Sequence, residues 1–416
     1  MSILNRYQGF EELELNGGVL PSEAAEAGAE DSVRAEIAEV QVELEQVSQE
    51  IEELRSEVAQ QDEAVEEIQE VVAGLESLIN SGSFNSSAFA NMYNRAAKLN
   101  VKLGGVSIER CGVESMTDAA TAQVMARTGM EGFMETVKGY AKKAIEVIKH
   151  IFNTVINFFV GLVSAAEKLG RRQEQLSTRL AATDKVKEKI KLGGWNALFD
   201  YEKNGLNKDP DGWSGTSVAL ANFANVGKEV TKVTLSSFNS AYAALESAIK
   251  KDAKTEVNAA EKSEGDKKVL IGMSAGVRVH VEMKDGTAKD LAEAAKQASS
   301  IKIHFGTGDV KKLTSGESAP KADKAALGAA LSKVKATVTA LRSGKVADAF
   351  SKAKRDQVIG SLNVMKADDK EKAEEVNLQV ALTRAIYSAA SSVTQAVNKQ
   401  TIRAASWTLD AVAAHI

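Results

Sequence analysis

The side chains best suited to metal binding or nucleophilic catalysis are few and far apart in this sequence. It contains four histidines and a single cysteine, Cys111. His150, His280, His304 and His415 are predicted to lie on separate elements, and no two of them have the spacing of a metal-binding pair. His280 and His304 could meet across paired strands, although a solvent-facing histidine is the more common case on a strand. The sequence therefore predicts no metal site, no cofactor and no enzymatic activity.

Two short glycine-containing motifs resemble catalytic loops but lack the required context. Residues 272–276, GMSAG, match the G-x-S-x-G pattern of a nucleophilic serine, which needs a strand before it and a helix after it. Here a strand is predicted to follow. Residues 306–312, GTGDVKK, lack the G-x-x-x-x-G-K-[ST] spacing of a phosphate-binding loop, so a turn is predicted. Neither motif changes the prediction of a non-enzymatic protein.

The charges are divided unevenly along the chain. Residues 1–114 contain 23 acidic and 7 basic side chains, a net charge of −16, whereas residues 115–416 contain 34 acidic and 45 basic ones, a net charge of +11. Such an imbalance indicates an anionic partner for the basic part, or attraction between the two parts. Contacts with DNA would be directed at phosphates, independent of sequence and weakened by salt.

The elements that carry these charges are predicted to be helices, because only three prolines interrupt long segments rich in Ala, Glu, Lys, Val and Leu. Apolar residues spaced by three and four from Val33 to Ile79 form an a/d heptad seam with one polar break, at Gln61. This segment contains 14 acidic residues against Arg34 and Arg55. A basic helix would therefore pair with it better than a second copy would, and a parallel dimer is the alternative.

The predicted fold is mainly α, with an N-terminal coiled coil and a helical-bundle domain that contains a small β-containing insert. The predicted segments are a flexible acidic arm at 1–32, the acidic coiled coil at 33–79, a linker at 80–114, a long-helix domain at 115–265, the insert at 266–310 and C-terminal helices at 311–416. In the insert, Val277, Val279 and Val281 alternate with polar residues, which is typical of a half-buried strand.

Apolar residues spaced by three and four from Phe133 to Leu169 predict one long helix. Within it, residues 145–163, IEVIKHIFNTVINFFVGLV, are apolar on nearly every side. Glu146, Lys149 and Asn153 interrupt this stretch, whereas a membrane span needs about 20 predominantly apolar residues. A central buried helix is therefore predicted, with no stable membrane span, and membrane insertion is the alternative.

The boundary between the acidic and basic parts resembles a processing site. Residues 112–114, GVE, followed by Ser115, are similar to the small-x-Glu motif after which prohead proteases of large tailed bacteriophages cut. The stretch from Glu114 to Val163, which begins ESMTDAATAQ, resembles internal head proteins of such phages. In those proteins a capsid-assembly propeptide precedes a mature domain that opens with a long amphipathic helix.

This resemblance implies a non-enzymatic virion structural protein, made in the host cytoplasm and located inside the capsid. Cleavage between Glu114 and Ser115 would release the acidic coiled-coil propeptide and leave a basic helical protein beside the packaged DNA. The implied partners are the prohead protease and other prohead core or capsid proteins. The small-x-Glu motif also occurs elsewhere, and SIE at 107–109 is the nearest competitor. An uncleaved coiled-coil scaffold or adaptor and a helical membrane-active protein are the alternative functions.

Overall fold

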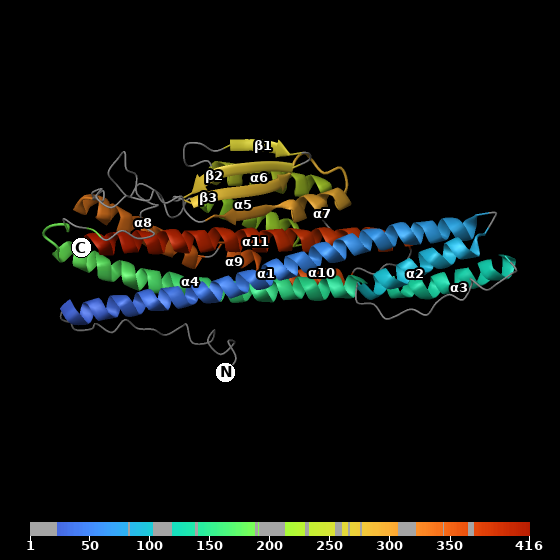
Figure 1. Cartoon of the computed structure of the whole chain (residues 1–416), viewed down its shortest axis with the longest axis horizontal. Coiled ribbons are helices and arrows are strands. Elements are labelled where there is room, and N and C mark those ends of the chain that lie inside the picture. Colours follow the sequence, from blue (N-terminus) through green and yellow to red (C-terminus); the bar gives the residue numbers. More distant parts are fainter. Residues whose placement is uncertain are drawn as a thin grey trace.

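Three long helices run side by side along the length of the molecule (Figure 1): α1 (Glu23–Asn80), α4 (Tyr140–Ala182) and α11 (Lys370–His415). The computed structural model describes residues 23–81, 84–102, 119–137, 140–187, 190, 213–228, 233–253, 260–264, 267–274, 277–306, 322–343, 345–364 and 370–416. Within these residues the chain is mainly helical, with a small antiparallel sheet. This confirms the predicted fold class.

Helix α1 begins earlier than predicted. It starts at Glu23, inside the segment that was predicted to be a flexible arm over residues 1–32. Residues 23–30, EAAEAGAE, consist mostly of Ala and Glu, whose high helix propensity outweighs that of the single Gly28. The prediction of an arm is therefore wrong from Glu23 onward, and residues 1–22 lie outside the described residues.

The shorter helices lie mostly in the predicted helical segments. They are α2 (Ser86–Lys102), α3 (Ala119–Val137), α5 (Ser214–Val226), α6 (Leu235–Ala253), α7 (Leu291–Ser300), α8 (Lys324–Ser343), α9 (Lys345–Ala349) and α10 (Lys352–Val364). The long helix predicted from Phe133 to Leu169 covers the end of α3 and most of α4, and residues 138–139 between them lie outside the described residues.

The sheet has the strand order β1-β2-β3-β4, and neighbouring strands are antiparallel. Its strands are β1 (Ala260–Glu264), β2 (Lys267–Ser274), β3 (Val277–Lys284) and β4 (Lys302–Phe305). Every second residue of β3 is buried, starting at Val277, which confirms the predicted alternation. The sheet begins at Ala260 rather than at residue 266, because the sequence of β1, AEKSE, has no alternation of apolar and polar residues that could predict a strand.

The apolar stretch at 145–163 contributes the centre of the main core. Phe152 and Phe158 of α4 are fully buried, and the ring of Phe152 lies 4.6 Å from that of Tyr387 and 5.7 Å from that of Phe350, measured between ring centroids. One described stretch, Ile145–Ala182, is long and apolar enough to cross a membrane, and 44% of its most apolar window is buried inside the protein. Core helices have the same composition, so the burial of these rings supports the predicted central helix.

Candidate functional site

The predicted cleavage residues, Glu114 and Ser115, lie outside the described residues, as does Cys111. They fall between the end of α2 at Lys102 and the start of α3 at Ala119. The structure thus describes the two helices that flank the predicted cut. Helix α2 also occupies much of the segment 80–114 that was predicted as a linker.

Helices α2 and α3 both pack against the C-terminal end of α1 (Figure 1). Their buried residues form one apolar group, which we call the tip cluster: Ala64, Ile68, Val71, Val72, Leu75 and Ile79 of α1, Phe89, Tyr93, Ala96 and Leu99 of α2, and Ala122, Ala126 and Met130 of α3, with Ala90 of α2 also buried. The side-chain amide of Gln123 on α3 donates a hydrogen bond to the carbonyl of Ile79 on α1. The helix that follows the predicted cut is therefore bound to the two helices that precede it.

Helix α1 covers a long surface of α4 and α11, which we call the α1 interface. The α1 residues in this core are members of the predicted heptad seam: Val33, Ile37, Val40, Leu44, Ile51 and Val58, none of them more than 7% exposed. A Cβ atom added to Gly161 of α4 would lie 3.0 Å from Leu44 Cδ2, so the two helices approach closely there. The seam was predicted to form a coiled coil. In the structure helices of the same chain fill it: α4 and α11 beside residues 33–58, and α2 and α3 beside residues 68–79.

Helix α1 runs antiparallel to α11 in one continuous register. Four polar contacts define it: Arg34 with Asp410, Glu45 with Lys399, Glu52 with Ser392, and Gln61 with Arg384. Residue numbers rise along α1 as they fall along α11 by nearly equal steps. The register therefore extends for about 40 Å at 1.5 Å per helical residue.

Acidic residues of α1 meet basic residues from the other part of the chain. Arg171 Nη2 lies 3.3 Å from Glu36 Oε2, and Lys168 Nζ donates to the carbonyl of Glu36 at 3.2 Å. Lys399 forms an ion pair with Glu45. These contacts agree with the expectation that basic residues suit this face. Such partly exposed pairs contribute at most about 1 kcal/mol each, whereas a buried Leu or Ile contributes about 1.5–3 kcal/mol, so the apolar seam dominates.

The one polar break in the seam faces a buried arginine. Arg384 is 4% exposed, and its Nη1 donates to Gln61 Oε1 at 3.1 Å. Burial lowers the pKa of Arg384 to about 10, so the side chain remains cationic at neutral pH. Arg55 donates to the carbonyl of Ser299 and to the hydroxyl of Ser392, both at 2.9 Å, and burial lowers its pKa as well. These partners could not be predicted from the sequence, because they lie 244 and 337 residues away from Arg55.

A cavity of about 590 Å³ lies where α1, β4 and α11 meet. Its polar lining includes Ser48 of α1, His304 of β4, and Gln395 and Lys399 of α11. The hydroxyl of Ser48 donates to the carbonyl of Leu44 at 2.8 Å, as a helical serine commonly does. The hydroxyl proton of Ser48 is thus donated to a backbone carbonyl of its own helix rather than to a basic side chain in the cavity.

The pairing of β3 with β4 places two of the four histidines opposite each other, which was the less favoured of the two arrangements expected from the sequence. His280 and His304 are directly opposite each other on β3 and β4. Among the residues that the structure describes, no group of three or more His, Cys, Asp or Glu could hold a metal ion. Ser274 of the GMSAG motif ends β2 and pairs with Val277 of β3, so a hairpin rather than a helix follows it.

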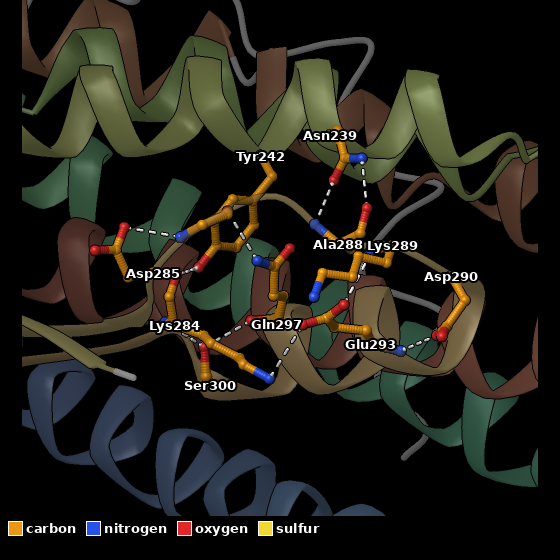
Figure 2. Close-up of polar contacts among 11 residues, drawn as sticks. Asn239, Tyr242, Lys284, Asp285, Ala288, Lys289, Asp290, Glu293, Gln297 and Ser300 are labelled. Atoms are coloured by element: carbon orange, nitrogen blue, oxygen red, sulfur yellow. Dashed lines mark hydrogen bonds and ion pairs between the residues drawn. The ribbon is translucent and has the colours of Figure 1, made fainter. Parts of the chain in front are cut away.

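A polar network joins α6 to the turn between β3 and α7 (Figure 2). The side chain of Asn239 donates to the carbonyl of Ala288 and accepts from its amide, both at 3.1 Å. The hydroxyl of Tyr242 donates to the carbonyl of Lys284 at 2.8 Å, and Gln297 donates to the carbonyl of Gly286 at 2.9 Å. These side chains hold backbone groups of the turn, so the network fixes the sheet to the helices. No sequence pattern predicted it.

Replacing Tyr242 with phenylalanine is expected to lower the free energy of unfolding by about 1 kcal/mol, because the carbonyl of Lys284 loses its donor. Chemical denaturation at neutral pH measures this loss.

Burial raises the pKa of Tyr242, so the unfolded chain releases the phenolic proton first and stability falls as pH rises above about 10. The Tyr242→Phe variant should lose less stability over that range. Equal alkaline losses in both proteins would contradict this assignment.

The chain was compared with known protein families, curated proteins and solved structures. A family model described as phiKZ-like phage internal head proteins matches residues 39–414. The match begins within α1 and ends within α11, so it includes both sides of the predicted cut. Comparisons with curated proteins and with solved structures found no match.

Proposed function

The chain belongs to the phiKZ-like phage internal head proteins, and we propose that a prohead protease cuts it after Glu114. It is a structural protein of the phage head, and its place is inside the capsid. We propose further that it has no enzymatic activity. Membership of this family also indicates association with other head or capsid proteins.

The observation that carries the proposed cut is the coincidence of a motif with a change of charge. The small-x-Glu sequence GVE ends at Glu114, where a segment of net charge −16 meets one of net charge +11. In the sequence the motif falls between the end of α2 at Lys102 and the start of α3 at Ala119. Connections between elements are the preferred places for proteolytic cuts. Cleavage would divide the chain into an acidic and a basic polypeptide.

Replacing Glu114 with glutamine is expected to abolish cleavage at this position, because the motif requires glutamate. The measurement is the mass and the N-terminal sequence of the protein recovered from mature capsids. The natural chain should begin at Ser115, and the variant should not.

The matched control is Glu109→Gln, which removes the competing motif SIE at 107–109. This control should still yield a terminus at Ser115. Two results would contradict the proposal: only intact chain in capsids that contain the natural protein, or a Ser115 terminus in the Glu114→Gln variant.

The charge of the chain and the packing of α1 bear on two kinds of partner, packaged DNA and other head proteins. We propose that residues 115–416 contact packaged DNA through phosphates, on the basis of their net charge of +11. The seam that a parallel dimer would need is buried within the α1 interface and the tip cluster. We therefore propose that the protein assembles with its neighbours through other surfaces.

A further inference from the structure

We propose that residues 23–102 stay bound to the basic part after the chain is cut between α2 and α3. The α1 interface is then a docking site for this N-terminal piece as a separate polypeptide. That the chain is cut in the phage head rests on the proposed function. That the N-terminal piece stays bound afterwards follows from the packing of α1. The sequence alone predicted the opposite, namely release of the acidic segment on cleavage.

The first reason is the apolar seam of α1. Ile37, Leu44 and Ile51 are at most 2% exposed, and they belong to one core with Phe152 of α4 and Val397 of α11. A cut in residues 103–118 removes none of these contacts. Dissociation would expose this whole row of large apolar side chains to water, which is the main free-energy cost of separating the pieces.

The second reason is the tip cluster, which lies beside the cut. Phe89 and Tyr93 of α2 are buried with Leu75 of α1 and with Ala122 and Ala126 of α3. Helix α3 belongs to the basic part, whereas α1 and α2 belong to the acidic part. The two new chain ends would thus come from helices that remain packed in one cluster, and cutting would not separate their contacts.

The ion pairs of the interface set its register more than its strength. Glu36 and Arg171 have side chains that are 38% and 57% exposed, and Glu45 and Lys399 are 54% and 30% exposed. Exposed pairs of this kind contribute little to stability and are screened by salt. The bound state should therefore survive concentrated salt and fail only when the helices themselves unfold.

Retention has a consequence for the basic part. Lys168, Arg171 and Lys399 would keep the contacts that they already make with Glu36 and Glu45 of α1. Packaged DNA would then meet other basic surfaces of residues 115–416, and cleavage would not uncover this row of cations.

The test uses the full-length chain with an engineered cut. A recognition site for a sequence-specific protease, flanked by Gly-Ser spacers, is inserted between Gly112 and Val113, and the purified protein is cut to completion. Size-exclusion chromatography at ~0.15 M and ~1 M NaCl then separates bound from free pieces, since the Debye length is only about 3 Å at the higher concentration. We expect both pieces to elute together under both conditions.

Elution of the N-terminal piece by itself at either salt concentration would overturn the proposal. Displacement of that piece by duplex DNA at ~0.15 M NaCl would also overturn it, because the cations under α1 would then be a DNA site. The engineered cut needs neither the prohead protease nor Glu114. Its outcome is therefore independent of whether the proposed natural cleavage occurs.

Paired variants separate the apolar seam from the charges. Leu44 is 2% exposed and Val42, two residues away on α1, is 58% exposed. After cutting, Leu44→Asp should lose the N-terminal piece, whereas Val42→Asp should retain it. The double variant Glu36→Gln and Glu45→Gln should retain it too, and its release would contradict the apolar argument. If Leu44→Asp does not fold before cutting, the elution of the two pieces without this substitution, at the two salt concentrations, still tests whether the N-terminal piece stays bound.

Discussion

Replacing Phe152 with alanine is expected to lower the free energy of unfolding by about 4 kcal/mol. Phe152 is fully buried, and its ring contacts those of Tyr387 on α11 and Phe350, which follows α9; these two rings also contact each other. Alanine removes both ring contacts and leaves a cavity that the surrounding helices can close only in part. Urea denaturation measures the loss. The control is Asn157→Ala on the same helix, where the side chain is exposed and little change is expected.

The same variant distinguishes a core helix from a membrane-active one. If residues 145–163 pack inside the protein core, the folded natural protein should not bind liposomes. A loss well below about 1 kcal/mol in Phe152→Ala, together with liposome binding by the natural protein, would contradict the burial of this helix. The membrane-active alternative would then account better for its composition.

Replacing Asp410 with alanine is expected to lower the free energy of unfolding by about 3 kcal/mol, because Arg172 loses its carboxylate partner in the core. Arg172 is 1% exposed, and its Nη2 donates to Asp410 Oδ1 at 2.8 Å. Asp410 is itself 19% exposed, so the loss should fall at the lower end of the range for buried pairs. Thermal or chemical denaturation of the purified protein measures it.

Two controls test that explanation. Arg34 approaches the same carboxylate at 3.5 Å, but its side chain is 62% exposed, so Arg34→Gln should cost less than about 1 kcal/mol. The double variant Arg172→Met and Asp410→Leu removes both buried charges and should recover most of the stability. A double variant as unstable as Asp410→Ala would show that packing at this site matters more than the ion pair.

Patterns within single elements were sufficient to predict most of the fold. The spacing of apolar residues from Val33 to Ile79 predicted the body of α1, and the alternation from Val277 to Met283 predicted β3. Both patterns depend only on how side chains are arranged along one element. Strand β1 was missed, because its five residues, AEKSE, carry no such pattern and are ordered by pairing with β2.

The candidate site could be predicted only in part. The motif at Glu114 and the change of charge beside it are local in the sequence, and the processing hypothesis came from them. The α1 interface brings together residues that are far apart, such as Arg55 with Ser392 and Gln61 with Arg384. One signal of this contact was available, since a lone polar residue in an apolar seam indicates a polar partner opposite it.

The sequence by itself determined that α1 has one apolar face and one acidic face, because both follow from the order of residues along a single helix. The tertiary structure alone decided what covers the apolar face. A heptad seam can bury itself against a second copy or against helices of its own chain, and the pattern is the same in both cases. Here α4 and α11 cover most of its length, with Leu44 over Gly161 and Glu45 beside Lys399, and α2 and α3 cover its C-terminal end. Helices of one chain meet at a high effective concentration, which favours this arrangement over pairing between chains.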